Sequence, residues 1–243
     1  AYVSQTTPQD VKTECEVPAP VKYVVPIIFI PGIMGSNIKD NNDSKVWYPG
    51  ISTFIPYSLR NARQRQIDLN PQTEEGNSDL VGIIPLKTLH FDERIQQKVP
   101  HMTKEIATAR GWGSVITIGY ANLLIYLESQ LNHPFKNIKD QVKDQFKGTT
   151  EWEKIVQPGN TLTEQILKNW SSTQTVELLS SAQHEDLADY AFPVFACGYN
   201  WLDSNINAAE KIADQLNAEV MTQINKEFPT AKFKQFIIVT HSM

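Results

Sequence analysis

Three short apolar runs stand out between long polar stretches of the chain. Residues 24–30, 192–197 and 236–239 are nearly continuous runs of aliphatic and aromatic side chains, and the first run ends at Pro31 and Gly32. A short apolar run without polar alternation is typical of a strand buried on both faces of a parallel sheet. The pattern therefore predicts three buried strands that run parallel.

A helix is predicted between the second and third runs. Apolar side chains recur there every three or four positions, the period of an amphipathic helix: Ile206, Ala209, Ala213, Leu216, Val220, Ile224 and Phe228. Ser204 or Asn205 can cap the start of this helix, and Pro229 prevents its continuation. A strand, a helix and a strand in this order form a βαβ crossover, so the predicted fold class is α/β.

Two polar stretches interrupt this alternation. Residues 39–110 are rich in Asn, Asp, Pro, Gln and Arg and are too long for an ordinary loop, so we predict a lid-like insertion. Residues 133–190 predict a small cap-like insertion with one short helix near residues 135–146. The expected organisation is an N-terminal extension, residues 1–21, followed by one domain, residues 22–243, that carries both insertions.

Composition and charge exclude several classes of protein. The 22 Lys and Arg against 27 Asp and Glu give a net charge of −5 without a long basic run, which argues against a nucleic-acid-binding protein. No apolar stretch reaches the roughly 20 residues of a membrane span. Cys15 and Cys197 are too few for a zinc cluster, and whether they form a disulfide stays open. The first twenty residues lack the pattern of a signal peptide.

The third predicted strand leads directly into Thr240, His241, Ser242 and Met243. An apolar strand followed by His-Ser-Met is typical of the nucleophile elbow of an α/β hydrolase, a tight strand-to-helix turn that exposes the serine hydroxyl. Thr240 stands where the usual pattern has glycine. The alternative is a buried strand that ends in an ordinary turn.

The succession of short motifs resembles the lecithin:cholesterol acyltransferase-like family of lipases, phospholipases and acyltransferases. The motifs lie in this order: the Pro-Gly-Ile-Met-Gly-Ser turn in residues 26–36, Trp47, Gly-Trp-Gly at 111–113, Tyr-Asn-Trp at 199–201 and His-Ser-Met at 241–243. The family's Tyr-Asp-Trp motif is present here as Tyr199, Asn200 and Trp201, with Asn in place of Asp. The resemblance implies an α/β-hydrolase fold with a mainly parallel sheet.

The resemblance also implies a set of site residues. Ser242 would be the catalytic nucleophile, and the main-chain N–H groups of Trp112 and Met243 would form the oxyanion hole. The substrate-binding residues would be Ile33, Met34, Trp47, Tyr199 and Trp201, although core packing is the alternative for Trp201. No cofactor and no metal are expected, because the Asp-Asn-Asn-Asp run at residues 40–43 offers oxygen ligands to calcium but lacks the spaced acids of a calcium loop.

A serine nucleophile needs a histidine base and a carboxylate that orients it. In α/β hydrolases both follow the serine in the chain. The five histidines are His90, His101, His133, His184 and His241, and none of them is assigned as the base. We therefore expect the chain to be the N-terminal part of a longer enzyme, in which a C-terminal segment supplies the Asp and the His, and we expect residues 1–243 alone to be inactive.

The main hypothesis is a serine lipase or phospholipase that cleaves acyl esters of lipids through an acyl-Ser242 intermediate. A lipid acyltransferase would use the same intermediate, and a non-catalytic binding module on a degenerate hydrolase fold is the alternative from another class. Residues 47–65 combine aromatic side chains with three arginines, which predicts a lid that meets a lipid surface; a loop packed on the domain is its alternative.

Some bacterial members of the resembling group are lipase effectors delivered into rival cells. The resemblance therefore favours a protein that is secreted or delivered outside the producing cell, although no signal peptide is visible. It also implies an inhibitory or immunity protein as a partner, besides the lipid surface.

Overall fold

The structure, a computed structural model, describes about half of the chain in continuous segments. These segments are residues 20–39, 45–48, 84–85, 101–132 and 179–242, with isolated residues at 61, 63, 95, 98, 99, 150 and 152. The chain divides into two compact units. The first comprises residues 1–25, 130–192 and 230–235, and the second comprises residues 26–129, 193–229 and 236–243.

The second unit is built on a parallel sheet of three strands. Its order is β7 (Val194–Ala196), β2 (Ile27–Ile30) and β9 (Ile237–Thr240), so β2, which comes first of the three in the sequence, lies in the centre. Ile28 of β2 is paired with Phe195 on one side and Ile238 on the other. The predicted crossover between two parallel strands of one sheet is therefore confirmed, with β2 lying between them.

Proline divides the predicted apolar runs. Pro26 follows β1 (Tyr23–Val24) and precedes β2, and Pro193 lies between β6 (Tyr190–Ala191) and β7. Proline has no N–H group to donate to a ladder, so the strand pairing is interrupted at each of these positions. Their carbonyls still take part, because Pro26 accepts from Ile237 N–H at 3.0 Å and Pro193 accepts from Ile27 N–H at 2.9 Å.

The prediction that the third run is buried on both faces is wrong for the described structure. Ile237 is 40% exposed and Ile238 is 54% exposed, although their side chains point to opposite faces of the sheet. Among the described residues, β9 pairs with β2 alone, so β9 lies at the edge of the described part of the sheet. The apolar composition predicted a central strand, and that environment is not present around β9 in the described residues.

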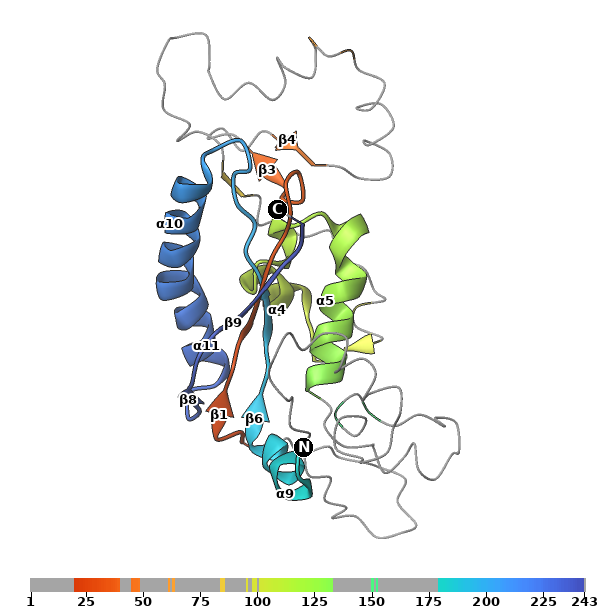
Figure 1. The fold of residues 1–243 in the computed structure, drawn as a ribbon, viewed down its shortest axis with the longest axis vertical. Helices are drawn as coiled ribbons and strands as arrows, with labels where there is room; N and C mark the ends of the chain where they lie inside the picture. The colour runs from red at the N-terminus through yellow and green to blue at the C-terminus, as the bar shows by residue number, and fades with distance from the viewer. Residues whose placement is uncertain are drawn as a thin grey trace, which may run out of the picture. The chain divides into compact units, whose positions relative to one another are not determined.

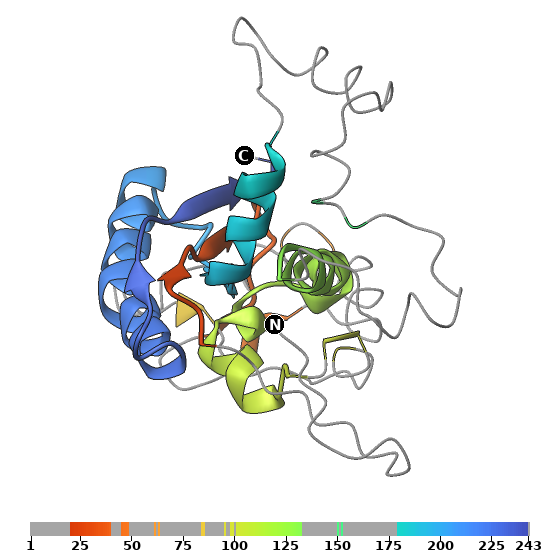
Figure 2. The same cartoon turned by 90° about the horizontal axis from the view of Figure 1, so that it is seen from below.

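Helices cover both faces of this sheet. Figures 1 and 2 show α10 (Asn205–Gln215) and α11 (Met221–Glu227) on one side of the strands and α5 (Thr117–Leu131) on the other. The predicted amphipathic helix is confirmed as α10, the π-helical turn η4 (Leu216–Val220) and α11 in succession. Ser204 is the N-cap, and its side chain accepts from the N–H of Asn207.

A short helix and a tight turn precede α5. Helix α4 (Lys104–Ala109) is capped by Thr103 and is followed by the 3-10 turn η2 (Trp112–Ser114). The second unit also contains a small antiparallel sheet of β4 (Lys45–Trp47), β3 (Ile38–Lys39) and β5 (Ile84–Pro85). Most of the predicted lid-like and cap-like insertions lies outside the described residues, including the helix expected near residues 135–146.

The first unit contains its own three-stranded parallel sheet, in the order β6, β1 and β8 (Lys232–Phe233). Helix α9 (Ser181–Asp186) begins with a capping box between Ser180 and Gln183 and continues into the 3-10 turn η3 (Leu187–Asp189). The side chain of Asn132 holds residue 192 at both main-chain groups, accepting from the Phe192 N–H at 2.8 Å and donating to its carbonyl at 3.0 Å.

Candidate active site

Ser242 lies immediately after the carboxyl end of β9 in a strained backbone conformation. Its φ angle is +40°, in the left-handed region that side chains other than glycine rarely adopt. The N–H of His241 donates to the carbonyl of Ile30 at 3.1 Å, which continues the pairing of β9 with β2 up to the turn. A serine held in a tight turn at the end of a parallel strand is the local geometry that a nucleophile elbow requires.

The turn after β2 packs directly against His241 and Ser242. A Cβ atom on Gly32 would lie 2.3 Å from the carbonyl oxygen of Ser242 and 2.7 Å from that of His241, so only glycine fits there. The turn closes with a hydrogen bond from Gly35 N–H to the Gly32 carbonyl at 2.9 Å, and Met34 adopts a φ of +63°. The first and last motifs of the sequence thus meet at the carboxyl ends of neighbouring strands.

Buried polar contacts connect this turn to the Gly-Trp-Gly segment. Asn37 donates through its side chain to the carbonyls of Gly113 and Val115, at 3.0 and 2.7 Å. Its main-chain N–H donates to the carbonyl of Ser114 at 2.8 Å. Because Asn37 and Ser114 are both buried, these bonds are shielded from water and fix the two segments against each other.

The Tyr-Asn-Trp segment joins the same assembly. The hydroxyl of Ser114 accepts from Gly198 N–H at 2.8 Å, and the hydroxyl of Ser36 accepts from Tyr199 N–H at 2.9 Å. A Cβ atom on Gly198 would lie 2.4 Å from the carbonyl of Ser114, so the two main chains touch. Three motifs that lie far apart in the sequence are therefore brought together in the second unit.

Trp112 occupies the first position of η2, and its side chain is only 2% exposed. The indole N–H donates to the carbonyl of Val194 at 2.8 Å. The preceding Gly111 has a φ of +76°, and a Cβ atom there would lie 2.2 Å from the carbonyl of Ala196. The indole thus anchors this turn to β7.

The five residues expected to bind substrate fall into two groups. Ile33 and Met34 project from the turn beside Ser242 and are 66% and 41% exposed. Trp47 was expected in an exposed lid but is buried, because its indole N–H donates to the Met34 carbonyl at 2.9 Å and its ring packs edge-on against Trp201 at 5.7 Å. Of the predicted lid at residues 47–65, only Trp47, Tyr48, Asn61 and Arg63 are described.

Tyr199 and Asn200 are also buried. Burial raises the pKa of the Tyr199 phenol, and nearby Tyr120 adds to this, so the hydroxyl stays protonated near neutral pH. Asn200 retains an oxygen where the family motif has a carboxylate, and this Oδ1 accepts from Leu202 N–H at 3.0 Å. The Nδ2 of Asn200 and the Nε1 of Trp201 are buried without a hydrogen-bond partner in the described part of the chain.

Tyr120 contacts the residue that precedes Ser242, and the sequence analysis did not identify it. It lies in the first turns of α5, and its hydroxyl is 3.0 Å from Nδ1 of His241. A tyrosine in an apolar helix gives no sequence signal of such a contact. The contact forms because the turn at residues 32–35 brings the start of α5 next to His241, through the bond from Ile116 N–H to the Gly35 carbonyl.

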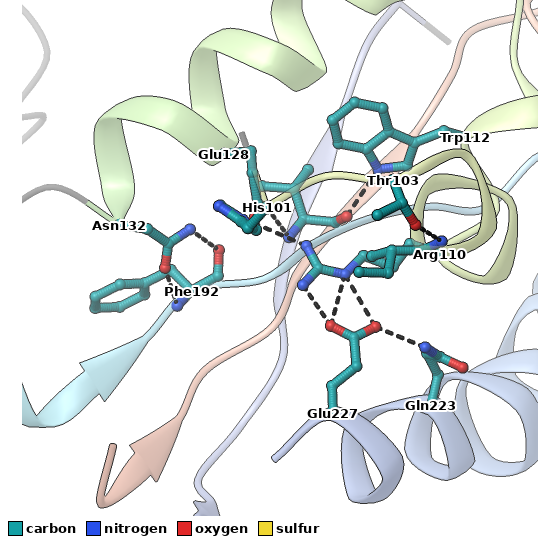
Figure 3. Close-up of polar contacts among 11 residues, drawn as sticks. His101, Thr103, Arg110, Trp112, Glu128, Asn132, Phe192, Gln223 and Glu227 are labelled. Atoms are coloured by element: carbon teal, nitrogen blue, oxygen red, sulfur yellow. Dashed lines mark hydrogen bonds and ion pairs between the residues drawn. The ribbon is translucent and has the colours of Figure 1, made fainter. Parts of the chain in front are cut away.

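A group of buried charged residues links the helices of the second unit to β7. Figure 3 shows Arg110 between the carboxylates of Glu128 and Glu227, with His101 on the far side of Glu128. Arg110 Nη1 is 2.9 Å from Glu128, and His101 Nε2 is 3.0 Å from the same carboxylate. Glu128 also accepts from the N–H of Val194 at 2.8 Å. The C-cap residue of α4 and charged residues of α5 and α11 are thus linked to the start of β7.

The pKa values of this group reflect both burial and pairing. Burial raises the pKa of Glu128, but the attraction of Arg110 and the hydrogen bonds from His101 and Val194 outweigh it, so the pKa lies below its usual value. Burial lowers the pKa of Arg110, and the two carboxylates more than reverse this. Both residues are therefore charged at neutral pH, and each depends on the other.

Several expected components lie outside the described residues. These are Met243 and the run at residues 40–43, together with His90 and His133. Among the described residues, no carboxylate is hydrogen-bonded to His241, and no cluster of three potential metal-ligating side chains is found. None of the helices in the described ranges is long and apolar enough to cross a membrane.

Comparisons with known proteins give one structural likeness. No family model and no curated protein matches the chain. The fold is similar to that in the crystal structure of the Tle4–Tli4 complex, with a TM-score of 0.65 and 23% sequence identity. The match covers 91% of this chain and 41% of that chain, so this chain spans about two fifths of the length of the structure it matches. The predicted α/β-hydrolase-like fold is thereby confirmed.

Proposed function

We propose that the chain carries the nucleophile of a serine esterase of the lipase or phospholipase type, with Ser242 as the attacking residue. The observation that carries the proposal is the strained conformation of Ser242, at φ +40° on the end of a parallel strand, with Gly32 packed against its carbonyl. A strained turn persists only where its surroundings enforce it, and such turns concentrate at functional sites.

The proposed chemistry is acyl transfer in two steps. Ser242 Oγ attacks the ester carbonyl, its proton passes to a histidine base, and the C–O bond to the alcohol breaks as that proton moves to the leaving oxygen. Water then attacks the acyl-Ser242 ester and releases the acid. The proposed oxyanion donors are the main-chain N–H groups of Trp112 and Met243. The N–H groups of the turn at residues 32–34 are a competing source of the first donor, since Gly32 touches the elbow.

A lipid ester is the substrate class that the exposed side chains favour. Ile33 and Met34 are large apolar residues exposed beside Ser242, where an acyl chain would bury them. Trp47, Tyr199 and Trp201 would then influence substrate binding through the turn that they support. Transfer of the acyl group to another alcohol would use the same acyl-enzyme, so an acyltransferase is an alternative within this proposal.

The acid and the base are proposed to come from polypeptide outside the described residues. In the described part of the chain, the outer edge of β9 has no strand partner, so a further parallel strand can add there, next to Ser242. The matched structure is longer than this chain, and it is a complex of two proteins. We accordingly propose a completing C-terminal segment, and a protein that inhibits the enzyme as a second partner.

The experiment is covalent labelling of the complete protein with a fluorophosphonate. Mass spectrometry of the peptide that contains His241 and Ser242 then locates the label. On the peptide that contains His241 and Ser242 we expect one label, on Ser242, and we expect hydrolysis of a short-chain ester to fall by several orders of magnitude in Ser242→Ala with folding intact. Ser129→Ala, a change on α5, is the matched control and should retain wild-type activity. Labelling at another serine, or full activity of Ser242→Ala, contradicts the proposal and favours the binding-module alternative.

A further inference from the structure

Three contacts converge on the side chain of Tyr120. Its hydroxyl is 3.0 Å from Nδ1 of His241, and its ring meets the imidazole edge-on with centroids 5.5 Å apart. The Tyr120 ring also packs against the ring of Phe29 in β2, with centroids 4.9 Å apart. The tyrosine therefore spans from the central strand of the sheet to the residue directly before Ser242.

The position of Tyr120 is itself fixed by the turn beside the elbow. Its N–H donates to the carbonyl of Ile116 at 3.0 Å, and the N–H of Ile116 donates to the carbonyl of Gly35 at 2.9 Å. A Cβ atom on Gly35 would lie 2.9 Å from the Tyr120 hydroxyl, so a glycine at this position makes room for that oxygen. The start of α5 and the turn at residues 32–35 thus hold one hydroxyl in place.

Ser242 needs such support because its conformation is unfavourable. A non-glycine residue in the left-handed region is strained, and the strain must be offset by contacts on either side. Gly32 supports the carbonyls of His241 and Ser242 from one direction. The only side chain of the described elbow with a hydrogen bond to the rest of the second unit is that of His241, and the residue it contacts is Tyr120.

We infer that Tyr120 is a positioning residue: its hydroxyl holds the His241 imidazole and thereby keeps Ser242 in the conformation from which it attacks. This inference rests on the proposed function. The hydrogen bond of the Tyr120 hydroxyl in the described residues is to His241, so Tyr120 acts on Ser242 through His241. Loss of its hydroxyl therefore changes how often Ser242 is correctly placed, and leaves apolar contacts with substrate unchanged.

The test compares Tyr120→Phe with Tyr126→Phe in the complete protein. Phenylalanine keeps the ring packing on Phe29 and removes only the oxygen, and Tyr126 is a second tyrosine on α5, half exposed and farther along the helix. For Tyr120→Phe we expect kcat and the rate of fluorophosphonate labelling to fall roughly tenfold to hundredfold with KM unchanged. We expect the melting temperature to shift by less than about 4 °C. Tyr126→Phe should match the wild type.

A spectroscopic measurement separates positioning from general weakening of the fold. The side-chain nitrogen resonances of His241 and the main-chain resonances of Ser242 should move in Tyr120→Phe and stay in place in Tyr126→Phe. Unchanged resonances, or wild-type kcat in Tyr120→Phe while Ser242→Ala is inactive, overturn the inference and leave the proposed function standing. Full activity of Ser242→Ala overturns the proposed function, and the inference with it.

Discussion

Replacing Arg110 by methionine should cost the protein a large part of its stability. Arg110 and Glu128 are 3% and 2% exposed, and their charged groups are 2.9 Å apart. Methionine keeps the aliphatic bulk of arginine but removes the charge, so Glu128 stays buried without Arg110, while His101 and the main-chain N–H of Val194 still contact it. Removing one partner of a buried ion pair typically costs about 3–5 kcal/mol. Set against a total stability of about 5–15 kcal/mol, this loss is severe.

The assay is unfolding in guanidinium chloride, followed by tryptophan fluorescence in the wild type and in Arg110→Met. In a thermal scan of a domain of this size, the same loss of stability corresponds to a fall in melting temperature of about 10 °C. Lys22→Met is the matched control, because the Lys22–Asp189 pair has a similar distance of 2.8 Å but lies at the surface, 66% and 35% exposed. An exposed pair of this kind contributes less than about 1 kcal/mol.

Two further measurements identify the buried Glu128 carboxylate, without its Arg110 partner, as the cause. Adding Glu128→Gln to Arg110→Met removes the buried charge but keeps an acceptor for Val194, and should restore about 1–3 kcal/mol. In the wild type the pKa of Glu128 is lowered by folding, so its contribution is present above its unfolded pKa of about 4.3 and is lost as the pH falls below it. The difference between wild type and Arg110→Met should therefore shrink in acid. A loss below about 1 kcal/mol, or a double variant no more stable than Arg110→Met, would refute the reasoning.

Three other substitutions, one of them with a control at Gly119, test the site. Gly32→Ala places a methyl group 2.3 Å from the Ser242 carbonyl and should abolish activity and lower the melting temperature, whereas Gly119→Ala, which has open space around it in α5, should raise stability by about 0.5–1 kcal/mol. Asn37→Ala removes two buried hydrogen bonds and should cost about 2–3 kcal/mol in chemical denaturation; a smaller loss would mean that water replaces them. Trp112→Phe removes the bond to the Val194 carbonyl and should reduce stability by about 1–2 kcal/mol. If Trp112 contributes only its main-chain N–H, kcat for a short-chain ester should change little.

The sequence predicted those parts of the fold that depend on local patterns. The apolar runs located β2 and β7, because continuous burial leaves an unbroken apolar signature, and a run of the same kind located β9 although that strand is exposed. The helical period and its caps located α10 and α11, since Ser204 and Pro229 bound the segment in the sequence itself. The fold class followed from their order.

The sequence could not predict the properties that depend on contacts between distant segments. The edge position of β9 is invisible in its composition, because a strand's neighbours are set by the whole sheet. Trp47 looked like an exposed aromatic in a polar stretch, but its indole is needed to bind the Met34 carbonyl. Arg110, Glu128 and Glu227 carry no sequence signal of an ion pair, and only the packing of α5 and α11 against the end of α4 brings their charges together.

The exposed edge of β9 has a consequence for the behaviour of this chain in solution. An apolar edge strand with unpaired N–H and C=O groups is a template on which another chain can add, in whatever register the two edges meet. Residues 1–243 produced on their own should therefore associate as concentration rises, through Ile237 and Ile238, and precipitate before they unfold. A lysine at position 238 would keep such a preparation monomeric, since a charge on an edge strand opposes pairing. The same lysine would prevent any segment from completing the sheet next to Ser242.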